Sequence, residues 1–258
     1  KMIEQLHITL VQTEIHWQNI AANLAMLDAK LSTIVATDLI VLPEMFSTGF
    51  SMNIALAEAM DGSTIQWMQR IATQKNCVVT GSLMIEADDK FYNRLIWMRP
   101  DGTLDYYDKR HLFSLSDEPK HYTAGNKLLV TVWKGWKILP LICFDLRFPV
   151  WSRNTHNYDA IIYVANWPQK RSLAWKTLLQ ARAIENQSYV IGLNRVGNDG
   201  NGVYHSGDSA VINPEGTYLY QKSDLEDIAT IIIDHNSLKA TRRKFPFLDE
   251  KDFFEIKP

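Results

Sequence analysis

Three reactive side chains each follow an apolar run in the sequence. Cys143 comes after residues 138–142, Glu44 after residues 39–43, and Lys109 after Tyr106 and Tyr107 with one aspartate between. A strand end that opens onto a turn is where α/β folds place reactive groups. A thiol nucleophile, a carboxylate base and a cation near the developing oxyanion are the groups that acyl transfer from an amide requires.

Each of the three also has a structural interpretation when it is taken alone. A free cysteine is most often a core residue, and a carboxylate or an ammonium group at the end of a strand most often turns to solvent. Cys77 opens the apolar run Cys-Val-Val, so we interpret it as a core residue. The spacing of Glu44, Lys109 and Cys143 does not by itself show that they meet.

Three segments around these residues resemble a known family. Residues 42–46 (LPEMF), 108–113 (DKRHLF) and 141–149 (LICFDLRFP) are similar to the three signature segments of the nitrilase superfamily of carbon-nitrogen hydrolases. The resemblance implies a four-layer αββα sandwich with two mixed β-sheets packed face to face and helices outside. It also implies that Glu44 is the general base, Lys109 stabilises the tetrahedral intermediate and Cys143 is the nucleophile.

Two further segments resemble one branch of this family, the ω-amidases. Residues 42–50 (LPEMFSTGF) and 121–126 (HYTAGN) look most like that branch, whose members hydrolyse the terminal amide of 2-oxo acids such as 2-oxoglutaramate. The expected reaction passes through a thioester and releases ammonia, and the expected partner is a small amide substrate.

Five more residues are candidates for the site. The resemblance suggests Glu118, in the loop after the lysine, as a second catalytic carboxylate and Asn166 and Trp167 as pocket residues. The structural alternatives are a solvated loop acid, a capping Asn and a packing Trp. We expect the main-chain N–H of Phe144 to contact the oxyanion. Arg147 either binds a substrate carboxylate through its guanidinium fork or braces the turn by pairing with an acid of the protein.

The rest of the chain must supply the elements that position these residues. Short β-type runs alternate with helical stretches, and turns at residues 100–102 and 213–216 indicate hairpins, so the sheets are expected to be mixed. The expected strands are 6–11, 38–42, 77–85, 92–99, 103–109, 137–143, 160–165, 189–195, 210–212, 217–221 and 228–233, and the expected helices are 19–34, 63–75 and 172–187.

Composition narrows the class of protein. The 258 residues are 46% hydrophobic and 22% charged, and 27 basic against 29 acidic residues give a net charge of −2 without a basic stripe, so nucleic acid is an unexpected partner. No apolar run approaches a membrane span, and the start of the chain lacks the apolar core of a signal peptide. Two cysteines suit a reducing compartment. We therefore expect a cytoplasmic protein with no membrane partner.

Metal and organic cofactors are not expected. The chain has no His-x-x-x-His and no Cys-x-x-Cys spacing, and the glycine-rich residues 197–202 lack a P-loop lysine and are better interpreted as a turn between strands. We expect His111 and His205 to orient or pack. Arg182 and Glu185, an i,i+3 pair, are interpreted as structural.

We also expect a single domain over residues 1–258, with residues 241–258 as a C-terminal arm that docks elsewhere, and the resemblance favours a homodimer. Three other interpretations stay open. They are a nitrile or N-carbamoyl hydrolase with the same three residues, a nitrilase-like subunit that binds without catalysis, and a papain-like Cys/His hydrolase that uses His111 or His205.

Overall fold

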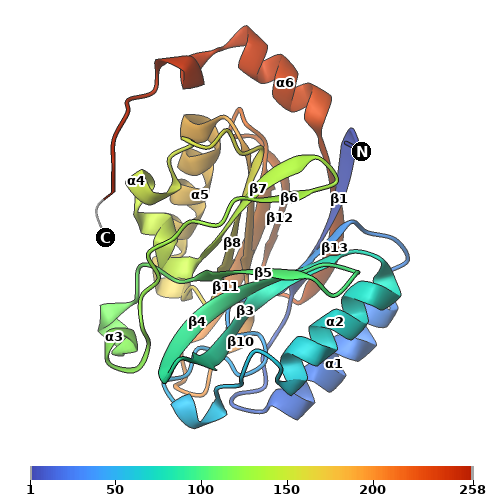
Figure 1. The fold of residues 1–258 in the computed structure, drawn as a ribbon, viewed down its shortest axis with the longest axis vertical. Helices are drawn as coiled ribbons and strands as arrows, with labels where there is room; N and C mark the ends of the chain where they lie inside the picture. Colours follow the sequence, from blue (N-terminus) through green and yellow to red (C-terminus); the bar gives the residue numbers. More distant parts are fainter. Residues whose placement is uncertain (1, 257–258) are drawn as a thin grey trace.

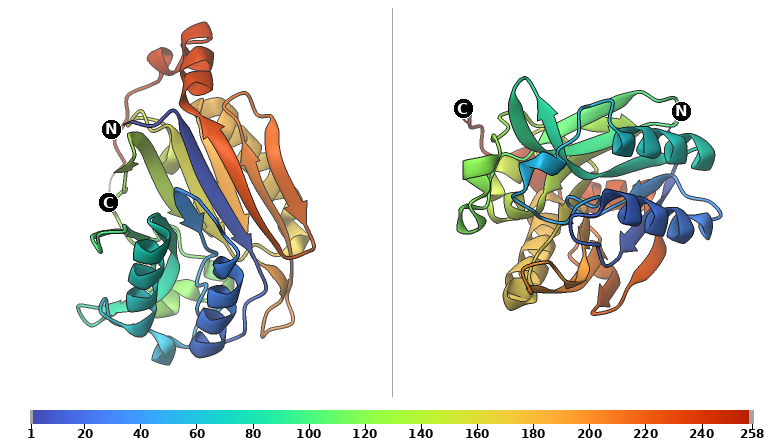
Figure 2. Two further views of the ribbon diagram at one scale, coloured as in Figure 1. Left: turned by 90° about the vertical axis from the view of Figure 1, so that its right-hand side faces the viewer. Right: turned by 90° about the horizontal axis from the view of Figure 1, so that it is seen from below.

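The computed structural model describes residues 2–256, which form two β-sheets packed face to face with helices outside them (Figures 1 and 2). The predicted four-layer αββα sandwich with mixed sheets is confirmed. No helix in residues 2–256 combines the length and the apolar character needed to cross a membrane.

The first sheet has the strand order β13-β1-β2-β3-β4-β5. Strands β1, β2 and β3 are parallel, β4 is antiparallel to β3, and β5 is antiparallel to β4, so β5 runs in the same direction as β2. The bounds are β1 Gln5–Gln12, β2 Leu39–Val41, β3 Val78–Ala87, β4 Lys90–Met98, β5 Leu104–Asp108 and β13 Asp227–Asp234.

The second sheet has the order β10-β11-β9-β8-β7-β6, with β12 paired to β11. Strands β7, β8 and β9 are parallel and form its centre, and the other pairings are antiparallel. The bounds are β6 Thr131–Trp133, β7 Trp136–Ile142, β8 Ala160–Ala165, β9 Tyr189–Asn194, β10 Val196–Asn198, β11 Tyr204–Ile212 and β12 Tyr218–Ser223.

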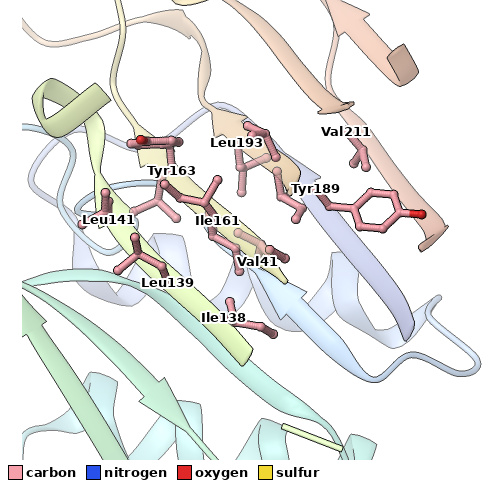
Figure 3. Packing of buried hydrophobic residues seen from close by; sticks show 14 of the residues in the cluster. Val41, Ile138, Leu139, Leu141, Ile161, Tyr163, Tyr189, Leu193 and Val211 are labelled. Atoms are coloured by element: carbon pink, nitrogen blue, oxygen red, sulfur yellow. The ribbon is translucent and has the colours of Figure 1, made fainter. Parts of the chain in front are cut away.

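Alternation along the strands of the first sheet divides its apolar side chains between two cores. Leu39 and Val41 of β2 belong to the core shared with the second sheet, whereas Ile40 belongs to the core beneath the helices. Successive side chains of a strand point to opposite faces, so a strand that is apolar at every position must be covered on both sides. Figure 3 shows part of the larger apolar cluster, which includes Val41 of the first sheet and Ile161 and Leu193 from the two faces of the second sheet.

Helices cover the two outer faces. Helices α1 (Ile20–Ser32) and α2 (Ser63–Lys75) lie on the first sheet, and α5 (Ser172–Asn186) lies on the second (Figure 1). Helix α5 approaches the sheet closely at Gly192, where a Cβ atom would lie 2.5 Å from a methyl group of Leu179. Only glycine leaves room for that contact.

The structure adds elements that the sequence pattern did not indicate. Strands β6 and β10 have three residues each, too few for a clear alternation, and β11 begins at Tyr204, six residues before the expected strand, because its first half is polar. Helix α6 (His235–Lys244) buries His235 and Leu238 but is otherwise largely polar, so it lacks an apolar stripe of helical period.

The boundary expected at Thr241 for the C-terminal arm therefore lies inside helix α6. The first part of the arm packs on its own chain, where Arg242 donates a 2.6 Å hydrogen bond to the carbonyl of Tyr158 and the carbonyl of Phe245 accepts one from Gln187. Farther along, Phe253 is 97% exposed.

Candidate active site

Strand direction brings the predicted site residues to one end of the sandwich. Because β2 and β5 run the same way, Glu44 and Lys109 emerge at the same edge of the first sheet. Cys143 follows β7 and Asn166 follows β8 at the matching edge of the second sheet. The two edges meet where the main-chain N–H of Asn166 donates a 2.9 Å hydrogen bond to Oε2 of Glu44.

A buried charge cluster lies behind the thiol. Nζ of Lys109 is 2.8 Å from Oε1 of Glu44 and 3.0 Å from Oε2 of Glu118, and all three side chains are at most 1% exposed. Glu118 also accepts a 2.6 Å hydrogen bond from the main-chain N–H of Phe113. A buried charge is tolerated when it is paired and hydrogen-bonded, and here one lysine is shared by two carboxylates.

Asn93 completes this cluster, and the sequence analysis missed it. Its Nδ2 donates to Oε1 of Glu44 at 2.8 Å and to Oε1 of Glu118 at 3.1 Å, while its Oδ1 accepts a 2.7 Å hydrogen bond from the hydroxyl of Ser82. The sequence carried a partial signal, because Asn93 lies in the predicted strand 92–99, two residues before the apolar run Leu95-Ile96-Trp97. A polar side chain in such a strand is either exposed or buried with hydrogen-bond partners. Strand pairing alone could not show which.

The thiol sits on a strained turn held by several buried groups. Cys143 has φ of +43°, which is uncommon for a residue other than glycine, and it opens the 3-10 turn Cys143–Arg147. The carboxylate of Asp145 accepts hydrogen bonds from the main-chain N–H of Ile142 and from the hydroxyl of Tyr107. Nδ1 of His111 lies 2.8 Å from Asp145. This network fixes the direction in which the sulfur points.

Arg182 supports the same turn from helix α5. It donates a 2.7 Å hydrogen bond to the carbonyl of Leu146, and its other nitrogen is paired with Glu185 at 2.8 Å. Arg182 and Glu185 therefore support the turn from beneath, and neither residue lines the cavity.

Electrostatics keep the thiol protonated at rest. Burial raises the pKa of Cys143 well above its usual value and the charge of Glu44 raises it further, while Lys109 and the main-chain N–H of Asn166 oppose the shift. Lys109 by itself would favour the thiolate, but desolvation by burial is the larger effect. A thiol held protonated in this way needs a base before it can act as a nucleophile.

The other two charged groups respond to the same burial. Burial lowers the pKa of Lys109, but Glu118 and Glu44 outweigh it, so the pKa is raised and the lysine stays charged. Burial raises the pKa of Glu118, with Lys109 opposing and Glu44 reinforcing the shift. A cation is therefore permanently present beside the sulfur.

A cavity of about 970 Å³ opens onto these groups. Its wall includes Glu44, Lys109 and Cys143 together with the four predicted substrate-binding residues, which are Phe144, Arg147, Asn166 and Trp167. Glu118 is not part of this wall, but it hydrogen-bonds to Lys109 and Asn93. The size suits a small organic substrate.

Arg147 lies on the aromatic face of Trp167, with its guanidinium carbon 5.0 Å from the ring centroid. Among residues 2–256 no carboxylate is within ion-pair distance of it. Trp167 is itself fixed at both ends, since its main-chain N–H donates to Asn194 and its indole N–H donates to the carbonyl of Arg171. Arg147 therefore has no acid partner among residues 2–256, although the alternative in which it braces the turn requires one.

His111 and His205, the histidines of the papain-like alternative, make contacts with groups other than Cys143. His111 stacks on Phe148 with ring centroids 3.7 Å apart, and Nδ1 of His205 lies 3.3 Å from the carbonyl of Gly197. No hydrogen bond joins either ring to the sulfur of Cys143 in the described chain. Residues 2–256 also contain no group of three or more His, Cys, Asp or Glu side chains arranged to hold a metal ion.

Comparison with known proteins places this geometry in a family. The chain is 46% identical to "Omega-amidase YafV" of Escherichia coli strain K12 over 253 residues, which is 97% of this chain and 98% of that protein. It is 33% identical to "2-oxoglutaramate amidase" of Bacillus subtilis, covering 84% of this chain and 86% of the other.

A solved structure agrees with these relatives. The CN-hydrolase superfamily protein XC1258 of Xanthomonas campestris, described with an arsenic adduct in its active site, superposes with a TM-score of 0.97 at 42% identity over 99% of this chain and 100% of that one. The family model for carbon-nitrogen hydrolases matches residues 7–243. The chain belongs to the carbon-nitrogen hydrolase family, the nitrilase superfamily, and is an enzyme that acts on carbon-nitrogen bonds.

Proposed function

We propose that this enzyme is a cysteine-dependent amidase that hydrolyses the terminal amide of a small 2-oxo dicarboxylic acid monoamide, such as 2-oxoglutaramate, to the acid and ammonia. The observation that carries the proposal is the meeting of Glu44, Lys109 and Cys143 at one cavity. The wall of this cavity also holds the guanidinium of Arg147, which has no acid partner among the described residues. The names of the relatives from E. coli and B. subtilis support the choice of substrate.

The first half of the reaction forms a thioester. Glu44 takes the proton of the thiol, and the sulfur of Cys143 adds to the amide carbon, so that negative charge moves to the amide oxygen. Lys109 and the main-chain N–H of Phe144 stabilise that oxygen. Glu44 then returns its proton to the nitrogen, the carbon-nitrogen bond breaks, and ammonia leaves.

The second half restores the thiol. Glu44 takes a proton from water, the hydroxide adds to the thioester carbon, and collapse of the intermediate breaks the carbon-sulfur bond. The proton held by Glu44 returns to the sulfur of Cys143. One carboxylate thus serves as base and acid in both halves, which agrees with a thiol that is protonated at rest.

We assign Glu118 a positioning role within this scheme. Both of its oxygens are engaged by Lys109, and Asn93 and the main-chain N–H of Phe113 take up further lone pairs. Its negative charge keeps Lys109 protonated, which leaves Glu44 free to exchange protons with the thiol and with water.

We further propose a single domain over residues 1–258 that forms a homodimer, with the segment from Phe245 onward as the contacting arm. Support comes from the core that both sheets share and from the exposed phenyl ring of Phe253. The two cysteines are both free thiols, which supports a cytoplasmic location. Light scattering of the intact chain and of a chain that ends at Lys244 tests the dimer and the arm.

An ammonia-release screen tests the proposed substrate. The purified enzyme is given 2-oxoglutaramate, the matching nitrile and an N-carbamoyl amino acid at equal concentration. Preferred turnover of 2-oxoglutaramate supports the proposal, and preference for the nitrile or the carbamoyl compound assigns the enzyme to another branch of the family. No turnover with any amide, nitrile or carbamoyl substrate would indicate a subunit that binds without catalysis.

Substitution of Arg147 tests how the substrate is held. If the guanidinium fork binds the carboxylate, Arg147→Lys raises KM for 2-oxoglutaramate about 10-fold and spares pentanamide, an uncharged amide of similar length, because only the charged substrate loses a bidentate contact. Equal losses on both substrates, measured by steady-state kinetics, would mean that Arg147 supports the turn instead.

A further inference from the structure

A second arginine faces the same cavity. Arg171 ends the 3-10 turn Gln169–Arg171, lines the cavity and is half-buried, with its guanidinium carbon 5.0 Å from the ring centroid of Phe113. That ring packs edge-on against Phe144, the residue after the nucleophile, with centroids 5.1 Å apart. Arg171 is therefore held beside the reacting thiol by an aromatic support.

The two arginines share one scaffold. Trp167 carries the guanidinium of Arg147 on its face, and its indole N–H donates a 2.8 Å hydrogen bond to the carbonyl of Arg171. Trp167 is 3% exposed, so both cations are anchored to the same fixed side chain. Burial lowers the pKa of Arg171, and the positive charge of Arg147 acts in the same direction, while Cys143 opposes the shift.

Nothing in the described cavity wall neutralises this pair. Glu44 is already paired with Lys109, and the carboxylate of Asp199 accepts hydrogen bonds from the main-chain N–H groups of Asn201 and Val203 in its own turn. No carboxylate of residues 2–256 lies within ion-pair distance of Arg171. Two like charges in one half-buried pocket repel each other, and an anion from outside removes that repulsion.

We propose that Arg171 is a second specificity-determining residue, which together with Arg147 forms a two-arginine site for the carboxylate of the substrate. The inference rests on the proposed function only for the identity of the amide. The two-guanidinium site itself predicts that the cavity attracts any small carboxylate toward Cys143. Arg171 acts by charge and hydrogen bonding to the substrate and takes no part in proton transfer.

Alkylation of Cys143 tests the site without any assumption about the natural substrate. Iodoacetate and iodoacetamide modify a thiol by the same displacement of iodide, and they differ in that iodoacetate carries a carboxylate where iodoacetamide carries an amide. The ratio of their rate constants on Cys143, measured by mass spectrometry, therefore reports the attraction of an anion to the cavity. Because the ratio compares two reagents on one protein, a change in the pKa of the thiol cancels from it.

The matched control is the neighbouring residue Lys170. It stands on the same turn and lines the cavity, but it is exposed, and no aromatic ring of residues 2–256 lies against its ammonium group. Arg171→Gln and Lys170→Gln remove the same charge and leave the same side chain. We expect Arg171→Gln to lower the iodoacetate to iodoacetamide ratio by about 5- to 10-fold and Lys170→Gln by less than about 2-fold, because the half-buried charge is screened less by solvent and salt.

A conservative variant and a kinetic measurement complete the test. Arg171→Lys keeps the charge, so it should restore most of the alkylation ratio while still raising KM for 2-oxoglutaramate, which loses a bidentate partner. An unchanged ratio in Arg171→Gln, or an equal fall in Lys170→Gln, would overturn the proposal. A lowered ratio in an enzyme that does not hydrolyse 2-oxoglutaramate would leave the anion site standing and refute the proposed substrate.

Discussion

The two cysteines of this enzyme occupy regions that differ in one decisive respect. Cys77 and Cys143 are both buried, at 0% and 9% exposure, and burial raises the pKa of both thiols, to about 12 for Cys77. Cys77 begins the apolar core between β3 and the helices. Cys143 ends a strand at a cavity, with the carboxylate of Glu44 and the ammonium group of Lys109 close to it.

The comparison shows that a raised thiol pKa does not by itself mark an inert cysteine. For Cys77 the raised value is the final state, because its side chain is fully buried in the apolar core between the first sheet and the helices. In the proposed mechanism, the same shift at Cys143 keeps the proton on the thiol until Glu44 takes it during attack on the substrate. Access to the cavity and a neighbouring base distinguish the two, and both are features of tertiary structure.

The largest expected effect comes from deleting each thiol in turn. Cys143→Ala should lower kcat by about 10⁴-fold or more without unfolding the protein, because it removes the nucleophile and a single heavy atom. Cys77→Ala should retain turnover and lose about 1 kcal/mol of unfolding free energy, from lost packing in the core. Ammonia release measures kcat, and urea unfolding measures the unfolding free energy. Wild-type turnover in Cys143→Ala would refute the mechanism.

Alkylation of the native protein should separate the thiols by about 10²-fold or more, since Cys77 is reached only through local opening of the core. Mass spectrometry with iodoacetamide gives both rates from one sample. Because burial and Glu44 raise the pKa of Cys143, its labelling rate should keep rising between pH 7 and pH 10 as the thiolate fraction grows. Faster labelling of Cys77 would reverse the assignment, and a plateau near pH 7 would show that Lys109 dominates.

Asn93→Ala tests the group that hydrogen-bonds to Glu44, the proposed base beside Cys143. The variant removes the amide that donates to Glu44 and Glu118, so kcat/KM should fall about 10- to 100-fold, equivalent to about 1–3 kcal/mol for a lost bond to a charged group. The control is Asn154→Ala, which deletes an equally buried amide bonded to Tyr158 and Asn186 away from the cavity. Equal loss of kcat/KM in both variants would reduce Asn93 to a folding role.

The last expected effect is on stability and leaves turnover at pH 7 aside; it extends the comparison from a buried acid to a buried base. Burial, reinforced by the charge of Arg195, lowers the pKa of His205 to about 4 from an unfolded value near 6.5. The unfolded chain binds the extra proton between these values, so stability rises with pH there, and about 3 kcal/mol present at pH 7 is lost as the pH falls from 6.5 to 4. Urea unfolding at several pH values should show a shallower slope in His205→Gln. An unchanged slope would contradict the shift.

Periodicity and motif made much of the fold and the centre of the site predictable. Strands such as Ala160–Ala165 and helices such as Ser63–Lys75 follow from runs whose apolar spacing matches a strand or a helix, and their bounds agree with the structure. The short strands β6 and β10 and the polar helix α6 carry no such pattern. Their formation depends on a neighbouring strand or on the surface that receives them.

The sequence by itself determined the family, the sandwich and the positions of Glu44, Lys109 and Cys143, because these depend on local patterns and on short segments read in order. Tertiary structure alone decided that Asn93 bonds to both carboxylates, that Arg147 has no acid partner among the described residues and that Arg171 joins it at the cavity. It also decided the direction of the thiol pKa, since desolvation depends on everything that packs around the sulfur and not on its neighbours in the chain.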